Sequence, residues 1–432
     1  MKIRNLIDLF RMSFYKQEHV FNCILMALTA AITLFGYEFA RSSTVVLFKN
    51  AYSTEDLPYV LALTPLVLLP LLYIYNLLLK KFGPQKTLFL STLLSALIFL
   101  VLHQLMQFKW RWPAAMLYVF REGYIVLLVE QYWSFINSSI QRRDAKKLNG
   151  IIMAIAGIGG IAGGLAVHNS SQVLGTSNLI IISALITMFS FIPAYFAYSR
   201  TSITVLKKKE LPAKKDGLGI SFILQEKTLF WIFMIVVFCQ FYSVVVYLNF
   251  EAEMQRAYPK PDEQTSFAGL FYAYANTFAL VSQLILAPIL LSKIRPAIIH
   301  LIIPLLHICT LVFIFIYPSV TAAASAFLIF KATEYSIFRS AKEILYIPFP
   351  DDVRFRTKEF IDIFCHRVSK SSISIVIAIC KQLGVVLSQS FYLGIIAVSL
   401  IVWILSSIGL IKSTSTSASA SADADESTSS QE

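Results

Sequence analysis

The sequence of 432 residues has little charge: only 14% of its residues are Asp, Glu, Lys or Arg, whereas 57% are hydrophobic. A soluble domain carries about a quarter charged residues. The long apolar runs of this chain reach the roughly 20 residues that a membrane-spanning helix needs. The low charge therefore excludes a soluble globular domain and predicts that lipid is the solvent for most of the chain.

The sequence also lacks the motifs of metal and catalytic sites. Its five cysteines stand alone without a CxxC spacing, and its six histidines form no HExxH motif. Isolated cysteines in apolar runs are typical of a hydrophobic core. We therefore expect no metal, no disulfide framework, no cofactor and no enzymatic activity.

Apolar segments recur along the chain after a polar, basic stretch at 1–19. The first run is too long for the core of a signal peptide, so we interpret it as an uncleaved span. In lipid each span must satisfy its own backbone hydrogen bonds, which predicts helices, whereas the alternating strands of a membrane barrel do not occur. The predicted spans cover residues 20–47, 56–79, 87–107, 113–140, 149–168, 177–198, 228–250, 266–291, 297–317, 319–347, 369–388 and 391–411.

Lysine and arginine concentrate in every second connection between these spans. They are frequent before the first span and at 80–86, 141–148 and 199–227, and sparse in the connections between. The positive-inside rule then places both termini in the cytoplasm. It also accounts for much of the net charge of +12, so that charge does not indicate a nucleic-acid partner.

The longest connection divides the spans into two groups of six. We predict an all-α polytopic membrane protein of about twelve helices in two six-helix bundles, a plan typical of transporters. The bundles would comprise residues 1–198 and 228–412, joined by a basic cytoplasmic linker at 199–227. The low-complexity, Ser/Thr/Ala-rich and acidic tail at 413–432 should be disordered.

Charged residues within the spans form three groups. A charge in lipid costs at least about 2.5–3.5 kcal/mol on insertion scales, so such residues should be paired or should face water. With Arg367, Lys370 and Lys381, eight cations lie in or close to the spans against five acids. This surplus suits an anionic substrate, although structural ion pairs remain the alternative for each group. The groups are Glu38 and Arg41 in the first span, Arg121, Glu122 and Glu130 in the fourth, and Lys331, Glu334, Arg339, Lys342 and Glu343 in the tenth.

Glycines crowd the fifth span in the stretch "AGIGGIAGG", which ends at Gly164. A phosphate-binding loop would need a following Lys-Ser or Lys-Thr, and neither is present. Small residues at such spacing let helix backbones approach closely in lipid. We therefore interpret the stretch as a helix-packing surface.

The stretch "SAKEILYIPFPDDVRFRTKEFIDIFCHRVSK" resembles the bacterial and plastid ATP/ADP translocases, the tlc-type nucleotide transporters. Further patches at 55–83, 117–151 and 253–271 are similar to the same family. The residues that match the family pattern in the quoted stretch are Lys342, Glu343, Tyr346, Ile347, Pro348, Lys358, Ile361, Asp362, Lys370 and Ser371. The resemblance implies a fold related to the major facilitator architecture and a nucleotide as substrate.

The resemblance also implies where substrate binds, because family members use charged residues in spans one, four, seven and ten. Glu122 and Lys342 match two of these positions. The chain departs from the pattern at the other two, where Thr44 replaces a lysine and Tyr247 replaces a glutamate. The departures point to a divergent member with an altered substrate or altered coupling.

We hypothesise a nucleotide carrier that works by alternating access. Its partner would be a small anionic substrate, and it would be a monomer in a bacterial inner membrane. Phosphates would sit near Lys342, assisted by Arg41, Arg121 or Lys331, and Tyr247 would lie near the base. The coupling or structural residues would be Glu38, Glu130, Glu334, Arg339 and Glu343.

Glu122 would either pair with a lysine in the empty site or carry a coupling proton. Two other functions remain open. One is a proton-coupled major facilitator carrier of another organic anion, indicated by the loop "KKFGPQKTLF". The other is a receptor or enzyme that does not transport.

Overall fold

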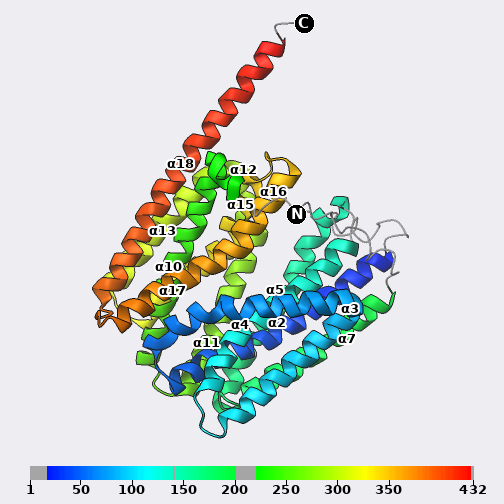
Figure 1. Ribbon diagram of the computed structural model, residues 1–432, viewed down its shortest axis with the longest axis vertical. Helices are drawn as coiled ribbons and strands as arrows, with labels where there is room; N and C mark the ends of the chain where they lie inside the picture. Colours follow the sequence, from blue (N-terminus) through cyan, green and yellow to red (C-terminus); the bar gives the residue numbers. More distant parts are fainter. Residues whose placement is uncertain (1–16, 140–141, 201–219, 430–432) are drawn as a thin grey trace. The chain divides into compact units, whose positions relative to one another are not determined.

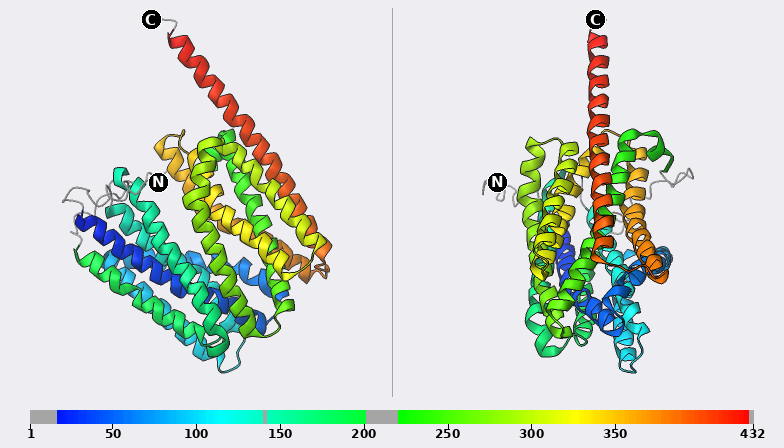
Figure 2. Two further views of the ribbon diagram at one scale, coloured as in Figure 1. Left: turned by 180° about the vertical axis from the view of Figure 1, so that it is seen from behind. Right: turned by 90° about the vertical axis from the view of Figure 1, so that its left-hand side faces the viewer.

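The computed structural model describes residues 17–139, 142–200 and 220–429, and every regular element within them is a helix (Figures 1 and 2). This confirms the all-α prediction. The first half contains α2 (Gln17–Ala51), the 3₁₀ turn η2 (Thr54–Asp56), α3 (Leu57–Met106), α4 (Trp112–Ser139), α5 (Arg142–Leu174), α6 (Leu179–Phe189) and α7 (Phe191–Arg200). Most of the predicted linker at 199–227 lies outside the described residues.

The second half contains more interrupted helices. Three of them pass through a π-helical turn, which we label η3, η4 and η5. The elements are α9 (Ile220–Gln225), α10 (Lys227–Ala257), α11 (Pro261–Val281), η3 (Ser282–Leu286), α12 (Ala287–Lys293), α13 (Pro296–Ile316), α14 (Val320–Thr333), η4 (Glu334–Phe338), α15 (Arg339–Leu345), α16 (Asp351–Glu359), η5 (Phe360–Cys365), α17 (His366–Gln382) and α18 (Gln389–Ser429).

Ten helices of the described residues are long and apolar enough to cross a membrane. The longest, Thr54–Met106, breaks at Gly83, whose φ of 76° and ψ of 171° suit only glycine. Pro84 follows it and disfavours a helical Gly83. Dividing this helix at Gly83, and adding the charged helix α14–η4–α15, gives the twelve predicted spans.

The described chain forms two compact units, and each includes a short segment from the other half of the sequence. Unit 1 comprises Met1–Ser53, Leu66–Ala213 and Lys260–Thr277. Unit 2 comprises Thr54–Pro65, Lys214–Pro259 and Phe278–Glu432. The first turns of α3 thus belong to unit 2, and most of α11 belongs to unit 1.

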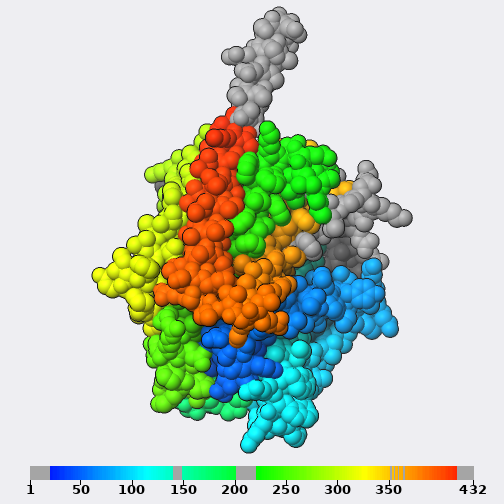
Figure 3. All heavy atoms as spheres, turned by 60° about the vertical axis from the view of Figure 1, so that its left-hand side comes forward, coloured from blue at the N-terminus to red at the C-terminus, as the bar shows by residue number. Residues whose placement is uncertain are grey.

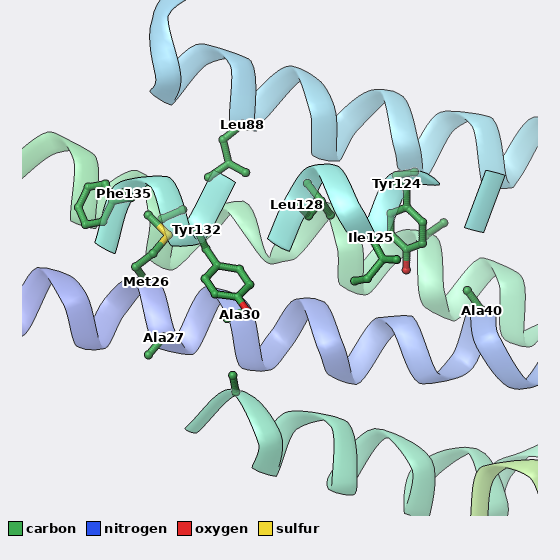
Figure 4. Packing of buried hydrophobic residues seen from close by; sticks show 14 of the residues in the cluster. Met26, Ala27, Ala30, Ala40, Leu88, Tyr124, Ile125, Leu128, Tyr132 and Phe135 are labelled. Atoms are coloured by element: carbon green, nitrogen blue, oxygen red, sulfur yellow. The ribbon is translucent and has the colours of Figure 1, made fainter. Parts of the chain in front are cut away.

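Helix α2 lies at the centre of unit 1, where it packs against α4, α5, α6 and α7. Its Met26 and Ala30 lie beside Tyr132 of α4 in the hydrophobic core (Figure 4). In lipid no hydrophobic driving force draws helices together, so van der Waals packing of such side chains holds this core. This core fixes the faces of α2 and α4 that carry the charged residues.

The glycines of α5 pack as predicted. A Cβ on Gly163 would lie 2.6 Å from the carbonyl oxygen of Phe35 in α2, and one on Gly164 would lie 2.7 Å from that of Gly269 in α11. Only hydrogen fits at these positions, because the neighbouring atoms are backbone. The prediction of a helix-packing surface is therefore confirmed.

Helix α10 has the central place in unit 2, as α2 has in unit 1. It packs against α14, α17 and α18 (Figure 1), and the red atoms of α18 lie along the green atoms of its N-terminal part in Figure 3. The backbone of α18 continues to Ser429, through the segment whose composition predicts a disordered tail.

Candidate functional site

The first charged group lies in unit 1 on one face of α2. Glu38 and Arg41 are one turn apart, and the Arg41 guanidinium lies 3.5 Å from the Glu38 carboxylate. Two side chains of α11 complete the group: Asn276 donates a hydrogen bond of 2.9 Å to Glu38, and the Tyr272 ring lies 3.6 Å from the Arg41 guanidinium carbon. The same face therefore holds an ion pair, an amide donor and a cation–π contact.

Helix α4 adds a second ion pair to this group. Arg121 is 3% exposed, pairs with Glu122 and donates a hydrogen bond of 3.0 Å to the backbone carbonyl of Arg41. Its guanidinium also lies 4.5 Å from the centre of the Tyr118 ring. We call Glu38, Arg41, Arg121 and Glu122 the arginine cluster.

The Glu122 side chain is one-third exposed, unlike the buried Arg121 beside it. Its partner is thus an adjacent arginine, whereas the sequence suggested a lysine. An acid that is accessible while its cation is buried can exchange partners with a ligand more readily than a fully buried acid.

The second charged group lies in unit 2, where α14 meets the π turn η4. Lys331 donates a hydrogen bond of 2.9 Å to Glu334, and both residues are buried. Gln240 of α10 donates a hydrogen bond of 3.0 Å to the other oxygen of Glu334. Glu334 is the first residue of η4, and π turns often occur at functional sites.

Lys342 of α15 pairs with Asp362, which lies in the π turn η5. Glu343 instead pairs with Lys358 at 2.7 Å, and both of those side chains are about two-fifths exposed. The side-by-side Lys342 and Glu343 thus take different partners, and only Lys342 lies in a buried environment.

The positive charge around Glu334 extends beyond Lys331. Lys370 of α17 also acts electrostatically on its carboxylate. Lys331, Lys342 and Lys370 in turn act on the imidazole of His366. We call Lys331, Glu334, Lys342, Asp362, His366 and Lys370 the lysine cluster. It brings three ammonium groups to one part of unit 2, which is the type of group that binds an anion.

Two predicted residues lie apart from both clusters. Glu130 on α4 and Arg339 on α15 are exposed. Tyr247 of α10 packs against Phe327, whose ring lies 5.5 Å from the Lys331 ammonium, so it borders the lysine cluster. Thr44 is buried and donates its hydroxyl to the carbonyl of Ala40, which leaves no charge at that family position.

The sequence did not indicate the residues that connect helices within each cluster. Asn276, Tyr272 and Gln240 are uncharged members of apolar helices and had no distinguishing pattern. Asp362 appeared only in the family pattern. It lies 20 residues after Lys342, so no helical spacing in the sequence indicated their pairing. No group of three or more potential metal ligands occurs among the described residues.

A cavity of about 510 Å³ in unit 2 is separate from the lysine cluster. It lies at the C-terminal end of α10, where Asn249, Glu253 and Arg256 line it together with Ser319 and Tyr392. None of the cluster residues contributes to its walls. Its charged lining consists partly of the exposed Arg256–Glu253 pair.

A model of the TLC ATP/ADP transporter family matches residues 316–413, the part of the chain that carries the lysine cluster. Over this region the chain is similar to the TLC transporters, at low identity to the individual relatives. The resemblance predicted from the stretch around Lys342 is thereby confirmed.

The individual relatives of this TLC-related chain are named as carriers. ADP,ATP carrier protein 3 of Rickettsia prowazekii is 23% identical, with 60% of this chain and 61% of the relative matched. ADP,ATP carrier protein 1 of Chlamydia trachomatis is 20% identical, with 70% and 65% matched. The chain thus spans less than two-thirds of the length of these relatives.

Solved structures with a similar fold are also transporters. The nucleoside transporter NupG has a TM-score of 0.64 at 11% identity, covering 91% of this chain and 99% of its own. A POT family transporter has a TM-score of 0.61 at 11% identity, covering 91% and 98%. At such identities the likeness concerns the fold, and it confirms a multi-pass, major-facilitator-like architecture.

Proposed function

We propose that this protein is a membrane carrier that moves nucleotides, by ATP/ADP exchange or nucleotide uptake, through alternating access. The observation that carries the proposal is the lysine cluster, which lies within the family-matched residues and holds two buried lysines, Lys331 and Lys342, each in an ion pair. A nucleotide brings the phosphate oxygens that such ammonium groups bind through charge-assisted hydrogen bonds.

Lys342 is the proposed phosphate ligand. Asp362 holds its ammonium group in the absence of substrate, and an incoming phosphate would compete with Asp362 for it. The exchange keeps the buried lysine paired at every stage, which avoids the cost of an isolated charge in the bilayer. Lys331 is held more tightly, because Glu334 and the Tyr335 hydroxyl both contact it.

The arginine cluster is proposed to assist transport from unit 1. Arg41 and Arg121 are the cations there, and Glu122 is the accessible acid. We further propose a monomer in a bacterial inner membrane, with both termini in the cytoplasm, because the basic connections alternate along the chain. Neither cluster offers covalent chemistry, which fits a carrier rather than an enzyme.

The test is uptake of labelled ATP into lipid vesicles that contain the purified full chain. Internal ADP should accelerate uptake if exchange is the mode, and a panel of unlabelled nucleotides should compete. Absence of any nucleotide-dependent flux, with the protein shown to be folded and inserted, would refute the proposal.

A second candidate is a carrier of another organic anion. The uncharged Thr44 and Tyr247, at positions where the family pattern has a lysine and a glutamate, favour it. Fewer cations in unit 1 suit a substrate with fewer negative charges than ATP. Competition by a simple organic anion, without competition by nucleotides, would support this candidate.

A further inference from the structure

Glu38 is the most buried carboxyl of the arginine cluster. Its residue is 2% exposed and lies in the middle of α2, within an apolar span. Asn276 of α11 and the packed backbone of α5 at Gly160 close the space around its Oε1 atom. The Glu38 carboxyl is therefore shielded from solvent in the described conformation.

The two carboxyl oxygens of Glu38 differ in their hydrogen bonding. Oε1 accepts the Asn276 hydrogen bond at 2.9 Å and lies 3.5 Å from Arg41. Oε2 is buried and has no hydrogen-bond partner. Arg41 lies over the Tyr272 ring at 3.6 Å, so its guanidinium is shared between the ring and the carboxylate.

This geometry is a poor match to a permanently ionised carboxylate. A buried charge needs donors on both oxygens, and an unsatisfied charged atom costs more than a neutral one. Arg41 nevertheless stays close enough to stabilise the ionised form when the proton leaves. Arg41 can therefore lie over the Tyr272 ring when Glu38 is neutral and can approach the carboxylate when Glu38 is ionised.

We propose that Glu38 is a proton-binding site that couples nucleotide transport to the movement of a proton. The step is a simple transfer: a proton from water on one side of the membrane binds the Glu38 carboxylate, and the neutral carboxyl later releases it to water on the other side. The proton coupling rests on the proposed nucleotide transport, but the proton-binding site itself does not.

The other ionisable groups near Glu38 come from two further helices. On α2 itself they are Tyr37 and Arg41, and α11 contributes Tyr272. Those of α4 are Arg121, Glu122 and Tyr124. Arg121 is already paired with Glu122, and helix α6 has no ionisable residue. Arg41 is therefore the cation that responds directly to the charge of Glu38.

Uptake under a pH gradient tests the coupling. In vesicles with the outside more acidic by about one pH unit, one coupled proton can drive up to about tenfold accumulation of labelled nucleotide. The variant Glu38→Gln should lose this accumulation. Glu38→Asp, which keeps a carboxyl, should retain the response to the gradient.

The matched control is Glu263→Gln in α11, the same substitution at an exposed ion pair with Lys260, which precedes the helix. It should accumulate nucleotide like the wild type. Gradient-driven accumulation by Glu38→Gln would overturn the coupling. A wild type that exchanges nucleotides but does not respond to the gradient would also overturn it.

If Glu38→Gln does not fold, Asn276→Ala replaces it. This variant removes a hydrogen bond to the ionised carboxylate and should move the pH midpoint of uptake upward. An unmoved midpoint overturns the coupling.

A measurement without nucleotide separates this inference from the proposed function. Infrared spectra of the protein in vesicles report a protonated carboxyl by its C=O stretch. The wild type should show a pH-dependent band that Glu38→Gln lacks and Glu263→Gln keeps. Lack of nucleotide flux with this band present counts against the proposed substrate only, whereas an absent band overturns the proton site.

Discussion

Lys342 and Glu343 are neighbours in the sequence, yet their side chains take different partners. Lys342 is buried and pairs with Asp362, whereas Glu343 pairs with Lys358 at a more exposed position. Successive residues on a helix point about 100° apart, so each can reach a different neighbouring helix. The adjacent Arg121 and Glu122 do pair with each other, so the sequence alone does not tell which arrangement a charged dipeptide takes.

The first residue-scale prediction concerns Lys342→Ala. Removing the ammonium group should lower nucleotide uptake by about tenfold to a hundredfold, the range expected for loss of a hydrogen bond between charged groups. Uptake of labelled ATP into vesicles measures it. Lys260→Ala, which removes a lysine from an exposed pair, is the control and should transport normally. Unchanged uptake by Lys342→Ala would exclude a phosphate-binding role.

The second residue-scale prediction concerns Lys331 and Glu334. Lys331→Ala alone leaves a buried carboxylate without its cation and should destabilise the fold by about 3–5 kcal/mol. The charge swap Lys331→Glu with Glu334→Lys keeps the pair, and Gln240 can turn its amide to present oxygen to the new lysine. Thermal unfolding in detergent should show a large loss for the single variant and a small loss for the swap. An equal loss in both would contradict the pairing.

At the scale of elements, interruptions of regular helix coincide with the lysine cluster. Glu334 opens η4, and Asp362 lies within η5, so both acids of the cluster occupy π turns. A π turn inserts one extra residue and changes which face the following side chains occupy. Helical periodicity applied to the sequence therefore cannot place residues beyond such a turn, which helps to explain why Lys342 lacked an obvious partner.

The element-scale prediction concerns the packing of α5. Gly163→Ala places a Cβ 2.6 Å from the Phe35 carbonyl oxygen and 2.8 Å from its Cα, so the backbones of α2 and α5 must separate. We expect a loss of about 1–3 kcal/mol, as for overpacked cores. Gly150→Ala in the same helix meets open space and should be neutral or slightly stabilising. Thermal unfolding of the two variants compares them, and equal midpoints would contradict close packing at Gly163.

At the scale of the whole molecule, the proposed nucleotide transport predicts that nucleotide binding stabilises the folded protein. A ligand that binds only the folded state stabilises it by about 2.7 kcal/mol at a hundredfold excess over its dissociation constant. ATP or ADP should therefore raise the thermal midpoint of the wild type, and Lys342→Ala should remove most of that rise. A nucleotide panel without any shift would contradict nucleotide binding, whereas a shift by another organic anion would favour the second candidate function.

The sequence by itself determined the class of this protein: a multi-pass helical membrane protein, the helix-packing role of its glycines and its relation to the TLC transporters. These follow from composition, because lipid requires continuous apolar helices, and from local motifs. Only the tertiary structure decided which charges meet. Glu38 finds Asn276 and Glu334 finds Gln240 far along the chain, because helix packing selects the faces that touch. The positions of charged residues along the sequence do not show which helix faces pack together.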